Sequence, residues 1–280
     1  QFSVVADIVK NKTRQLADEA LTLAELFDAA GYDTACYTQN PWTGRSYNLD
    51  QGFDHFHEVR NDRYAKEPGW GLAGEVAERH RAASDLPRFT YVHMRRPHTP
   101  FDPPDVVLDQ FVDVDYDGPI EGNDQDIERH NGGELRMNAA DAQHHLDRYH
   151  ANIRQADRCV ERMLDGVDRE RTLVLVLSDH GEAFGQHARY GHNWRSFEEF
   201  VHIPMVLSHP RLPPGTSAAP AMTVDVLPTL AELFDLDLSA APAALQGESL
   251  VPLLFEGQAP ERPHVFTSAR LDHRGERHMA

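Results

Sequence analysis

The chain has 280 residues, and its 45 acidic residues against 27 basic ones give a formal net charge of −18. Because like charges repel, this balance excludes a nucleic-acid backbone or an anionic membrane surface as a general partner. Nor does any apolar run reach the length that crosses a bilayer. An acidic surplus with only three lysines is typical of a protein kept soluble in a high-salt cytoplasm.

The amino end, QFSVVADIVKNKTRQ, lacks the basic, apolar and small-residue series of a signal peptide. Since the chain opens on Gln1 and not on Met, the sequence leaves open a segment upstream that was removed. The two cysteines, Cys36 and Cys159, are too few and too far apart for a disulfide framework or a thiolate metal site, so both are predicted to be small buried residues.

Helical and strand patterns alternate along the chain, which predicts an α/β fold with a mixed, mostly parallel sheet flanked by helices, in one domain over 1–280. The first half gives helices at 17–32 and 71–84 and strands at 33–38 and 88–94. The second strand leads into RRPHTPFDPP, where four prolines within eight residues predict a rigid loop.

The segment 102–133 is acidic and has little periodic pattern, so a surface excursion is favoured over a Ca²⁺ loop. After it, 134–167 predicts one long helix or two abutting ones. Its histidines, His144, His145 and His150, are interpreted as a solvated cluster and not as a metal site. The rest predicts strands at 172–178, 202–208 and 264–269, a helix at 223–236 and a turn at 245–257.

The strand at 172–178 ends abruptly in Asp179, His180 and Gly181. Leaving the strand there lets a carboxylate and an imidazole converge on one point, with Gly181 allowing the chain to reverse. Oxygen and nitrogen ligands together suit Mn²⁺ or Zn²⁺, and the carboxylate also suits Ca²⁺ or Mg²⁺. Spacing alone favours a metal site no more than an Asp179 cap beside an exposed His180.

A second group of polar residues follows the strand at 88–94, with His93 at its end and His98 between prolines. A histidine fixed by flanking prolines suits a general acid or an anion contact, because holding it in place costs little further ordering. A loop histidine packed on Phe101 is the equally open alternative. Parallel strands place ligand sites at their carboxyl ends, so we expect the two loops to act together.

The segments LVLSDHGEAFGQHARYGHNWRSFEEFVHIPMVLSHP, TVDVLPTLAEL and LQGESLVPLL resemble the carboxyl half of the sulfatase family, in the alkaline-phosphatase superfamily. The segments LTLAELFDAAGYDTACYTQNPW, QGFDHF and FTYVHMRRPHTPFDPP resemble the middle of that family, in the same order. The resemblance covers residues 17–255. It implies an alkaline-phosphatase-like fold and a hydrolase of small-molecule sulfate or phosphate esters that uses one divalent cation, Ca²⁺, Mg²⁺, Mn²⁺ or Zn²⁺.

The resemblance also assigns roles to residues. It implies that Asp179 and His180 ligate the cation, that His98 contacts the ester oxygens or protonates the leaving group, and that His192 faces the same anion. His93 and His187 are candidate substrate-binding residues. Where this chain has His192, many sulfatases have lysine; a histidine can be neutral and ligate metal, so a two-metal phosphoesterase or phosphomutase stays open.

A larger departure from the family is an absence. The family's first strand, with paired acidic metal ligands, and the Cys/Ser-x-Pro-x-Arg turn with the nucleophile have no equivalent in this sequence. The resemblance therefore implies the carboxyl-side portion of such a domain, incomplete at the amino end and inactive by itself, with open strand edges that favour homo-oligomers. The other alternative is a non-catalytic relative that binds an anion or a partner protein.

Overall fold

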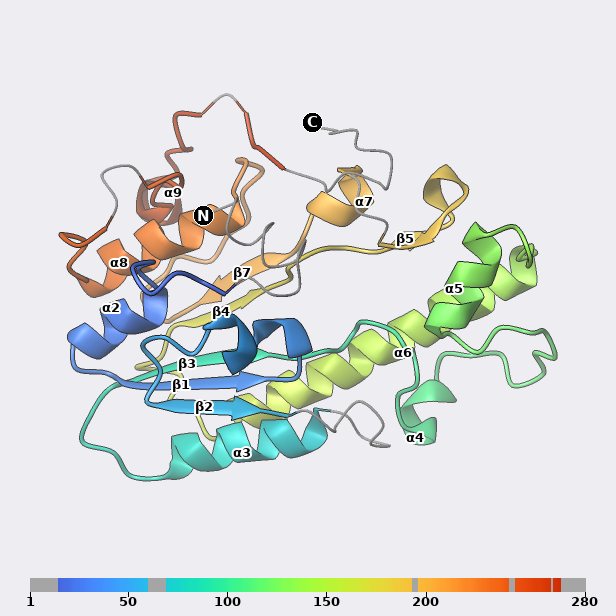
Figure 1. Ribbon diagram of the computed structural model, residues 1–280, viewed down its shortest axis with the longest axis horizontal. Helices are drawn as coiled ribbons and strands as arrows, with labels where there is room; N and C mark the ends of the chain where they lie inside the picture. Colours follow the sequence, from blue (N-terminus) through green and yellow to red (C-terminus); the bar gives the residue numbers. More distant parts are fainter. Residues whose placement is uncertain (1–14, 60–68, 193–195, 242–244, 263, 268–280) are drawn as a thin grey trace.

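The computed structural model describes residues 15–59, 69–192, 196–241, 245–262 and 264–267, and Figure 1 draws their helices and strands. In this part of the chain the strands form three groups. β1 lies between β2 and β3 in a parallel sheet, β4 pairs with β7 in an antiparallel ladder, and β5 and β6 form a hairpin. The strands are β1 (Asp33–Thr38), β2 (His55–Glu58), β3 (Arg88–His93), β4 (Val174–Leu177), β5 (Ala183–Phe184), β6 (Tyr190–Gly191) and β7 (Met205–Ser208).

Helices cover both faces of the parallel sheet, so this part of the fold has three layers (Figure 1). On one face Leu72 of α3 and Met163 of α6 pack against Tyr37 of β1. On the other face Phe27 of α2 stacks on Phe89 of β3 with ring centroids 4.4 Å apart, and α8 joins the same cluster. The helices are α2 (Leu23–Ala29), α3 (Trp70–Arg81), α4 (Asp105–Leu108), α5 (Asp124–Asn131), α6 (Ala139–Leu164), α7 (Glu198–Val201), α8 (Val226–Phe234) and α9 (Val251–Glu256), with short 3₁₀ turns at Pro41–Thr43, Arg45–Tyr47, Gln186–Ala188 and Thr223–Asp225.

The α/β class and the mostly parallel sheet flanked by helices are confirmed, and most of the longer elements lie where the sequence predicts them. The strand predicted at 33–38 is β1, and the predicted helix at 134–167 is one helix, α6. The helix predicted from residue 17 begins only at Leu23, because Thr22 caps it: the Thr22 hydroxyl accepts from the Glu25 N–H and the Glu25 carboxylate accepts from the Thr22 N–H.

Two predictions near the carboxyl end are wrong or lie partly outside the described residues. The turn predicted at 245–257 contains a helix, α9, which begins with a proline in its first turn. The edge strand predicted at 264–269 is not a strand over 264–267, and its last two residues lie outside the described part of the chain. Cys36 and Cys159 are both buried, as predicted.

The histidines of α6 differ from the predicted solvated cluster. His150 is exposed, but His144 and His145 are buried. His144 stacks on Tyr116 with ring centroids 3.8 Å apart, and the Tyr116 hydroxyl donates to Asp141 of the same helix at 2.8 Å. The prediction failed because distant segments cover the two rings, Tyr116 over His144 and other aromatic side chains around His145, and no periodic pattern reveals this packing.

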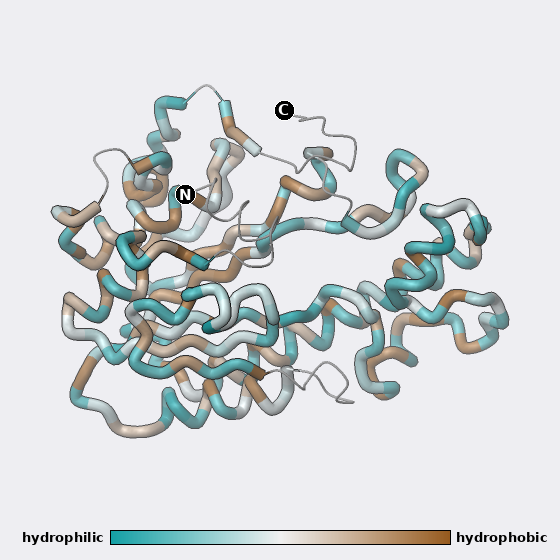
Figure 2. The backbone as a smooth tube through the Cα atoms, viewed as in Figure 1, coloured by the Kyte–Doolittle hydropathy of each residue, from teal (hydrophilic) through white to brown (hydrophobic). Residues whose placement is uncertain are grey.

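Two short helices, α4 and α5, form within the segment 102–133, which the sequence pattern does not indicate. Hydrophobic residues gather along the strands and on the helices packed on them, while α5 is mostly hydrophilic (Figure 2). A capping box at Asn123 starts α5: its side chain accepts from the Asp126 N–H, and Asp126 in turn accepts from the Asn123 N–H. The start of α5 is thus set by a capping box and not by a periodic pattern of apolar residues.

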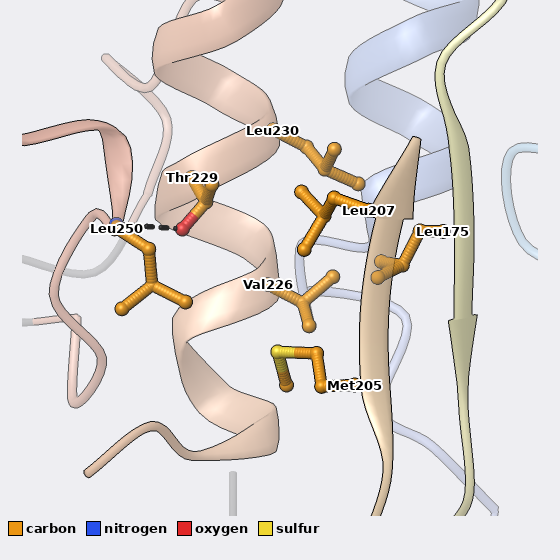
Figure 3. A pocket seen from close by; sticks show the side chains of 7 residues that line it. All are labelled: Leu175, Met205, Leu207, Val226, Thr229, Leu230 and Leu250. Carbon is orange, nitrogen blue, oxygen red and sulfur yellow. Dashed lines mark hydrogen bonds between the residues drawn. The ribbon is translucent and has the colours of Figure 1, made fainter. Parts of the chain in front are cut away.

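A small space under the antiparallel ladder is part of the core and not a ligand site. Figure 3 shows the side chains of β4, β7 and α8 that converge on it, with Thr229 accepting a hydrogen bond from the Leu250 N–H at 2.9 Å. The space is about 10 Å³, room for about one water molecule, and its other lining side chains are apolar. The substrate therefore has to be sought elsewhere.

β3 and β4 each have one edge without a strand partner in the described residues, because β3 pairs only with β1 and β4 only with β7. Large side chains on these strands stay exposed, namely Tyr91 on β3 and Val176 and Leu177 on β4. By contrast β1, paired on both edges, is buried over almost its whole length. The loops that follow β3 and β4 carry the polar residues that the sequence singles out.

Candidate active site

The loops after β3, β4 and β6 bring three histidine rings together. His98 lies in the proline-rich loop after β3, His180 lies in the turn after β4, and His192 directly follows β6. The ring centroids of His180 and His192 are 4.2 Å apart, those of His98 and His192 are 4.8 Å apart, and those of His98 and His180 are 6.3 Å apart. We call these three side chains the histidine cluster.

In each ring of the histidine cluster, Nδ1 lies within hydrogen-bond distance of an oxygen atom of the chain. The Nδ1 contacts are His180 to the Gly181 carbonyl at 2.8 Å, His98 to the Thr99 carbonyl at 2.9 Å, and His192 to the Glu182 carboxylate at 3.1 Å. Carbonyl and carboxylate oxygens accept, so Nδ1 carries the hydrogen in each ring. Nε2 is therefore the nitrogen left for a ligand in all three rings.

Glu182 and His192 stand opposite each other at the open end of the β5–β6 hairpin, because the hairpin pairs Ala183 with Gly191. The Glu182 side chain is 7% exposed and that of His192 31%. Burial by itself would lower the pKa of the His192 imidazole, but the hydrogen bond and negative charge of Glu182, with smaller contributions from nearby aspartates, outweigh it and raise this pKa. His192 is therefore disposed to carry a proton.

Hydrogen bonds with side chains of two helices, α6 and α5, hold the loop around His98 in place. The Asn152 side chain of α6 donates to the carbonyl oxygens of Pro97 at 3.0 Å and His98 at 3.2 Å. On the other side the Thr99 hydroxyl donates to Asp124, the first residue of α5. The predicted rigid loop is thus fixed by buried side-chain hydrogen bonds as well as by its prolines.

The pKa of His98 moves in the direction opposite to that of His192. Burial lowers the pKa of His98; the Thr99 carbonyl opposes this, and the positive charges of His192 and Arg95 add to it. Two adjacent rings with diverging proton affinities are what an acid–base pair requires. The two pKa shifts therefore favour a neutral His98 beside a protonated His192.

Asp179 and His180 form the more open part of the site. The Asp179 side chain is 60% exposed and that of His180 36%, and an Asp179 carboxylate oxygen lies 3.9 Å from Nε2 of His180. One carboxylate and one imidazole whose Nδ1 is held by a carbonyl fit a divalent cation. In the described residues, no group of three or more His, Cys, Asp or Glu side chains is arranged to hold a metal ion. The pair thus offers two ligands and not a complete shell.

Gly181 has a different role from the one expected. Its φ is not in the left-handed region, so the chain does not need glycine there to reverse. Instead the backbone of another segment comes close: the Gly181 N–H donates to the Phe200 carbonyl at 2.9 Å, and a Cβ on Gly181 would lie 2.1 Å from the Glu199 carbonyl oxygen. Glycine is required for this close approach, which fixes the turn that carries His180.

His93 uses both ring nitrogens within the chain. Oδ1 of Asn40 accepts from the Trp42 N–H, which turns its amide nitrogen toward Nε2 of His93, 3.2 Å away. Nδ1 then carries the hydrogen and lies 3.2 Å from the Tyr91 hydroxyl. Burial lowers the pKa of His93, and the charge of Asp179 opposes this. His93 therefore stands beside the site, and its substrate-binding role stays a prediction.

His187 lies apart from the histidine cluster. Its ring stacks on Phe197 with centroids 3.9 Å apart and approaches a Glu199 carboxylate oxygen at 3.5 Å, and its side chain is 53% exposed. In the part of the chain that the structure describes, no hydrogen bond or ring contact joins it to the three clustered histidines. Its substrate-binding role also stays a prediction.

Three residues of this site are missed by reasoning from the sequence: Glu182, Asn40 and Asn152. Glu182 follows Asp179 by only three positions, but its place opposite His192 depends on a hairpin whose strands are two residues long. Asn40 and Asn152 act through tertiary contacts that no local pattern encodes. A carboxylate flanking a short hairpin near a histidine was the one available signal.

Comparison with known proteins identifies the family of the chain. The profile of the sulfatase family matches residues 2–236. The choline-sulfatase of Rhizobium meliloti is 34% identical over 110 residues, 38% of this chain and 21% of the relative. The endo-4-O-sulfatase of Bacteroides thetaiotaomicron is 24% identical over 302 residues, 89% of this chain and 58% of the relative. The chain thus spans only part of the length of these relatives.

Solved structures share the fold. The phosphonate monoester hydrolase of Agrobacterium radiobacter matches with a TM-score of 0.72 and 20% identity, over 94% of this chain and 67% of that one. A protein solved with its substrate D-glucosamine-2-N,6-O-disulfate matches with a TM-score of 0.70 and 18% identity, over 96% and 72% of the two chains. Because the family profile covers most of its length, the chain belongs to the sulfatase family of the alkaline-phosphatase superfamily.

Proposed function

We propose that this chain carries part of the active site of a metal-dependent hydrolase that cleaves small-molecule sulfate esters, or phosphate esters. The observation that supports the proposal is the histidine cluster beside Asp179. Its three Nε2 atoms make no hydrogen bond with the described residues, and each Nδ1 is already fixed by an acceptor. Such prepared nitrogens beside an open carboxylate suit a tetrahedral anion held against a cation.

The proposal gives each residue a role. Asp179 and His180 would hold one divalent cation, Ca²⁺, Mg²⁺, Mn²⁺ or Zn²⁺, which polarises an ester and activates a nucleophile when bound. His192, disposed to carry a proton, donates to a non-bridging oxygen of the anion. His98 holds or moves the proton of the leaving group. His93 and His187 remain candidate contacts to the rest of the substrate.

We propose further that the nucleophile and the remaining metal ligands come from a segment outside these 280 residues, so that this chain by itself turns over no ester. Two observations support this. In the described residues the metal-ligand set stops at a carboxylate and a neighbouring imidazole, and the chain spans 58% of its endo-4-O-sulfatase relative. The acidic, lysine-poor composition supports a cytoplasm of high salt as its setting.

Activity on two matched esters tests the proposal. A chromogenic aryl sulfate and the corresponding aryl phosphate are assayed with Mn²⁺ or Ca²⁺, first with this chain and then with the chain joined to its upstream coding sequence. We expect turnover only in the joined protein, and its loss in His98→Ala and Asp179→Ala. A start codon and promoter directly upstream of Gln1, or a joined protein that binds sulfate without turnover, would instead support a non-catalytic anion-binding relative.

A two-metal phosphoesterase or phosphomutase is the second candidate, favoured by the free Nε2 of His192. An imidazole in that position can ligate a second ion, which a lysine cannot do once protonated. The fold shared with a phosphonate monoester hydrolase is compatible with phosphorus chemistry. Two ions per chain in the joined protein, with one lost in His192→Ala, would favour this candidate; a single ion that survives the substitution would favour the sulfatase.

A further inference from the structure

Glu182 is the buried carboxylate of the candidate active site. Its side chain is 7% exposed, whereas that of Asp179, three residues earlier, is 60% exposed. Its two carboxylate oxygens lie 3.1 Å and 3.4 Å from Nδ1 of His192. Within the described part of the chain this carboxylate makes no other hydrogen bond or ion pair. Its single polar partner is thus a ring of the histidine cluster.

Contacts with α5 fix the backbone that carries His192. β6 is clamped by α5: the Asn131 amide donates to the Tyr190 carbonyl at 2.8 Å, and its oxygen accepts from the Tyr190 N–H at 3.2 Å. Gly191 adopts φ +80° and touches Ile127 of α5, since a Cβ there would lie 2.9 Å from that side chain. His192 therefore leaves β6 at a set point.

A histidine ring has two nitrogens, and the group that binds one decides what the other offers. When a carboxylate accepts a hydrogen bond from Nδ1–H, the ring is held in one orientation. Nε2 then carries a lone pair in the neutral ring and the second proton in the charged ring. For His98 and His180 the acceptors are backbone carbonyls, which no side-chain substitution removes. For His192 the acceptor is a side chain, so this member of the cluster is oriented by a replaceable residue.

We propose that Glu182 is a positioning residue that holds His192 in the Nδ1–H tautomer and presents Nε2 to the ligand bound between His192 and the other two clustered histidines. Glu182 itself does not touch the ligand. The identity of that ligand as a sulfate or phosphate group rests on the proposed function, whereas the tautomer does not. The two can therefore be tested separately.

The tautomer is read directly by nitrogen NMR on the full chain. Histidine rings are labelled with ¹⁵N, long-range ¹H–¹⁵N spectra are recorded at an alkaline pH where the ring is neutral, and the His192 signals are identified by their loss in His192→Gln. In the unsubstituted chain we expect a protonated Nδ1 and an unprotonated Nε2. In Glu182→Gln, whose amide can both donate and accept, we expect the single tautomer to be lost.

A matched control is Glu199, which lies in α7. Glu199→Gln changes a carboxylate that approaches the ring of His187, 3.5 Å away, and it should leave the His192 signals unchanged. Glu182→Asp keeps the carboxylate and should keep Nδ1 protonated in at least part of the molecules. A protonated Nε2 in the unsubstituted chain would overturn the proposal, and this result needs no variant to fold. So would an unchanged Nδ1–H signal in Glu182→Gln.

Binding of inorganic sulfate and inorganic phosphate, followed on the same nitrogen signals at a lower pH where Nε2 of His192 carries its second proton, separates this proposal from the proposed function. Loss of an outer-shell partner costs about 10- to 100-fold in ligand affinity, so we expect Glu182→Gln to weaken anion binding by about that factor and Glu199→Gln to change it by less than about 2-fold. If neither anion binds but the tautomers behave as stated, the proposed anion site fails and Glu182 stands. If the anions bind equally in both variants, the positioning role fails.

Discussion

The loop after β4 holds two carboxylate–imidazole pairs that differ in almost every physical respect. Asp179 and His180 are neighbours in sequence, their side chains are 60% and 36% exposed, and an Asp179 carboxylate oxygen lies 3.9 Å from Nε2 of His180. Glu182 and His192 are separated by a hairpin, largely buried, and hydrogen-bonded at 3.1 Å. The same two functional groups thus occur once as an open pair and once as a closed pair.

The difference underlies the two proposed roles, Asp179 as a cation ligand and Glu182 as a positioning residue. Both oxygens of the buried Glu182 carboxylate lie within 3.4 Å of Nδ1 of His192, so turning this group toward a cation would weaken that contact, which is costly. The exposed Asp179 carboxylate accepts one hydrogen bond, from the His180 N–H at 3.0 Å to Oδ1, and in the described residues its other oxygen has no such partner and can face a cation. Burial and hydrogen-bond distance therefore assign Asp179 and Glu182 to different tasks, although the sequence presents both beside histidines.

The strongest way to break the comparison is to remove the open carboxylate. In the protein joined to its upstream sequence, Asp179→Asn should lower Mn²⁺ affinity by more than about 100-fold, since a direct ligand matters more than an outer-shell partner. The free energy of unfolding of the metal-free protein should stay within about 0.5 kcal/mol. Calorimetric titration measures the affinity, and Asp157→Asn, an exposed carboxylate on α6, is the control.

A third imidazole, His145, sharpens the comparison because it has no carboxylate partner at all. It is 0% exposed, it lies among the rings of Phe101, Phe184 and Tyr190, and neither ring nitrogen has a hydrogen-bond partner in the described residues. Burial lowers its pKa from 6.5 to about 4. Below about pH 6.5 His145 becomes protonated in the unfolded chain, whereas in the folded chain it becomes protonated only near pH 4.

The consequence is a loss of stability in acid. The free energy of unfolding should fall by up to about 3 kcal/mol as the pH drops from about 6.5 to about 4, from this residue alone. Urea denaturation at several pH values measures the fall, and His145→Leu should reduce it by that amount. An equal acid sensitivity in His145→Leu would show that other groups are responsible.

A smaller effect distinguishes the two carboxylates by stability. Glu182→Gln should lower the free energy of unfolding by about 1.5–3 kcal/mol at neutral pH, because it weakens a buried hydrogen bond to a charged group. Asp179→Asn serves as the matched comparison, and its effect should lie near zero. Urea denaturation of both variants checks this, and equal effects would remove the distinction between an open and a closed pair.

The smallest expected effect concerns His187, which lies on the same loop but outside the cluster. Its contacts are a stacked Phe197 ring and a Glu199 carboxylate oxygen 3.5 Å away, and in the described residues no hydrogen bond or ring contact joins it to the histidine cluster. His187→Ala should change phosphate or sulfate affinity by less than about 2-fold, whereas His192→Ala should remove most of it. A large effect at His187 would place it in the substrate contacts that the resemblance suggests.

The sequence predicts the parts of this fold that carry a local signal. DTACYT reads as β1 because β-branched and aromatic residues dominate it, and the long run without proline or glycine reads as α6. Gly181 was recognised as necessary but for the wrong reason, since a sequence cannot show that the backbone at Glu199 passes within 2.1 Å of its absent side chain.

The sequence predicts which histidines belong to the site, but not which side chains pair with them. His98, His180 and His192 could be singled out from proline flanks, a strand end and a family resemblance, and the structure brings their rings together. Glu182 could not be singled out from the sequence. Its pairing with His192 depends on the register of the hairpin and on the hydrogen bond from α5 to β6. The burial of His145 was missed for a similar reason: its aromatic surroundings come from three other segments.

The open edges of β3 and β4 set a practical limit on how this chain can be handled. In the described residues, one edge of β3 and one edge of β4 have no strand partner, and exposed apolar side chains flank them. Such edges can pair with strands of other molecules and so promote aggregation. Yield of soluble monomer should therefore fall as concentration rises during purification. Arginine or mild urea in the buffer should recover it, without any change in the residues of the site.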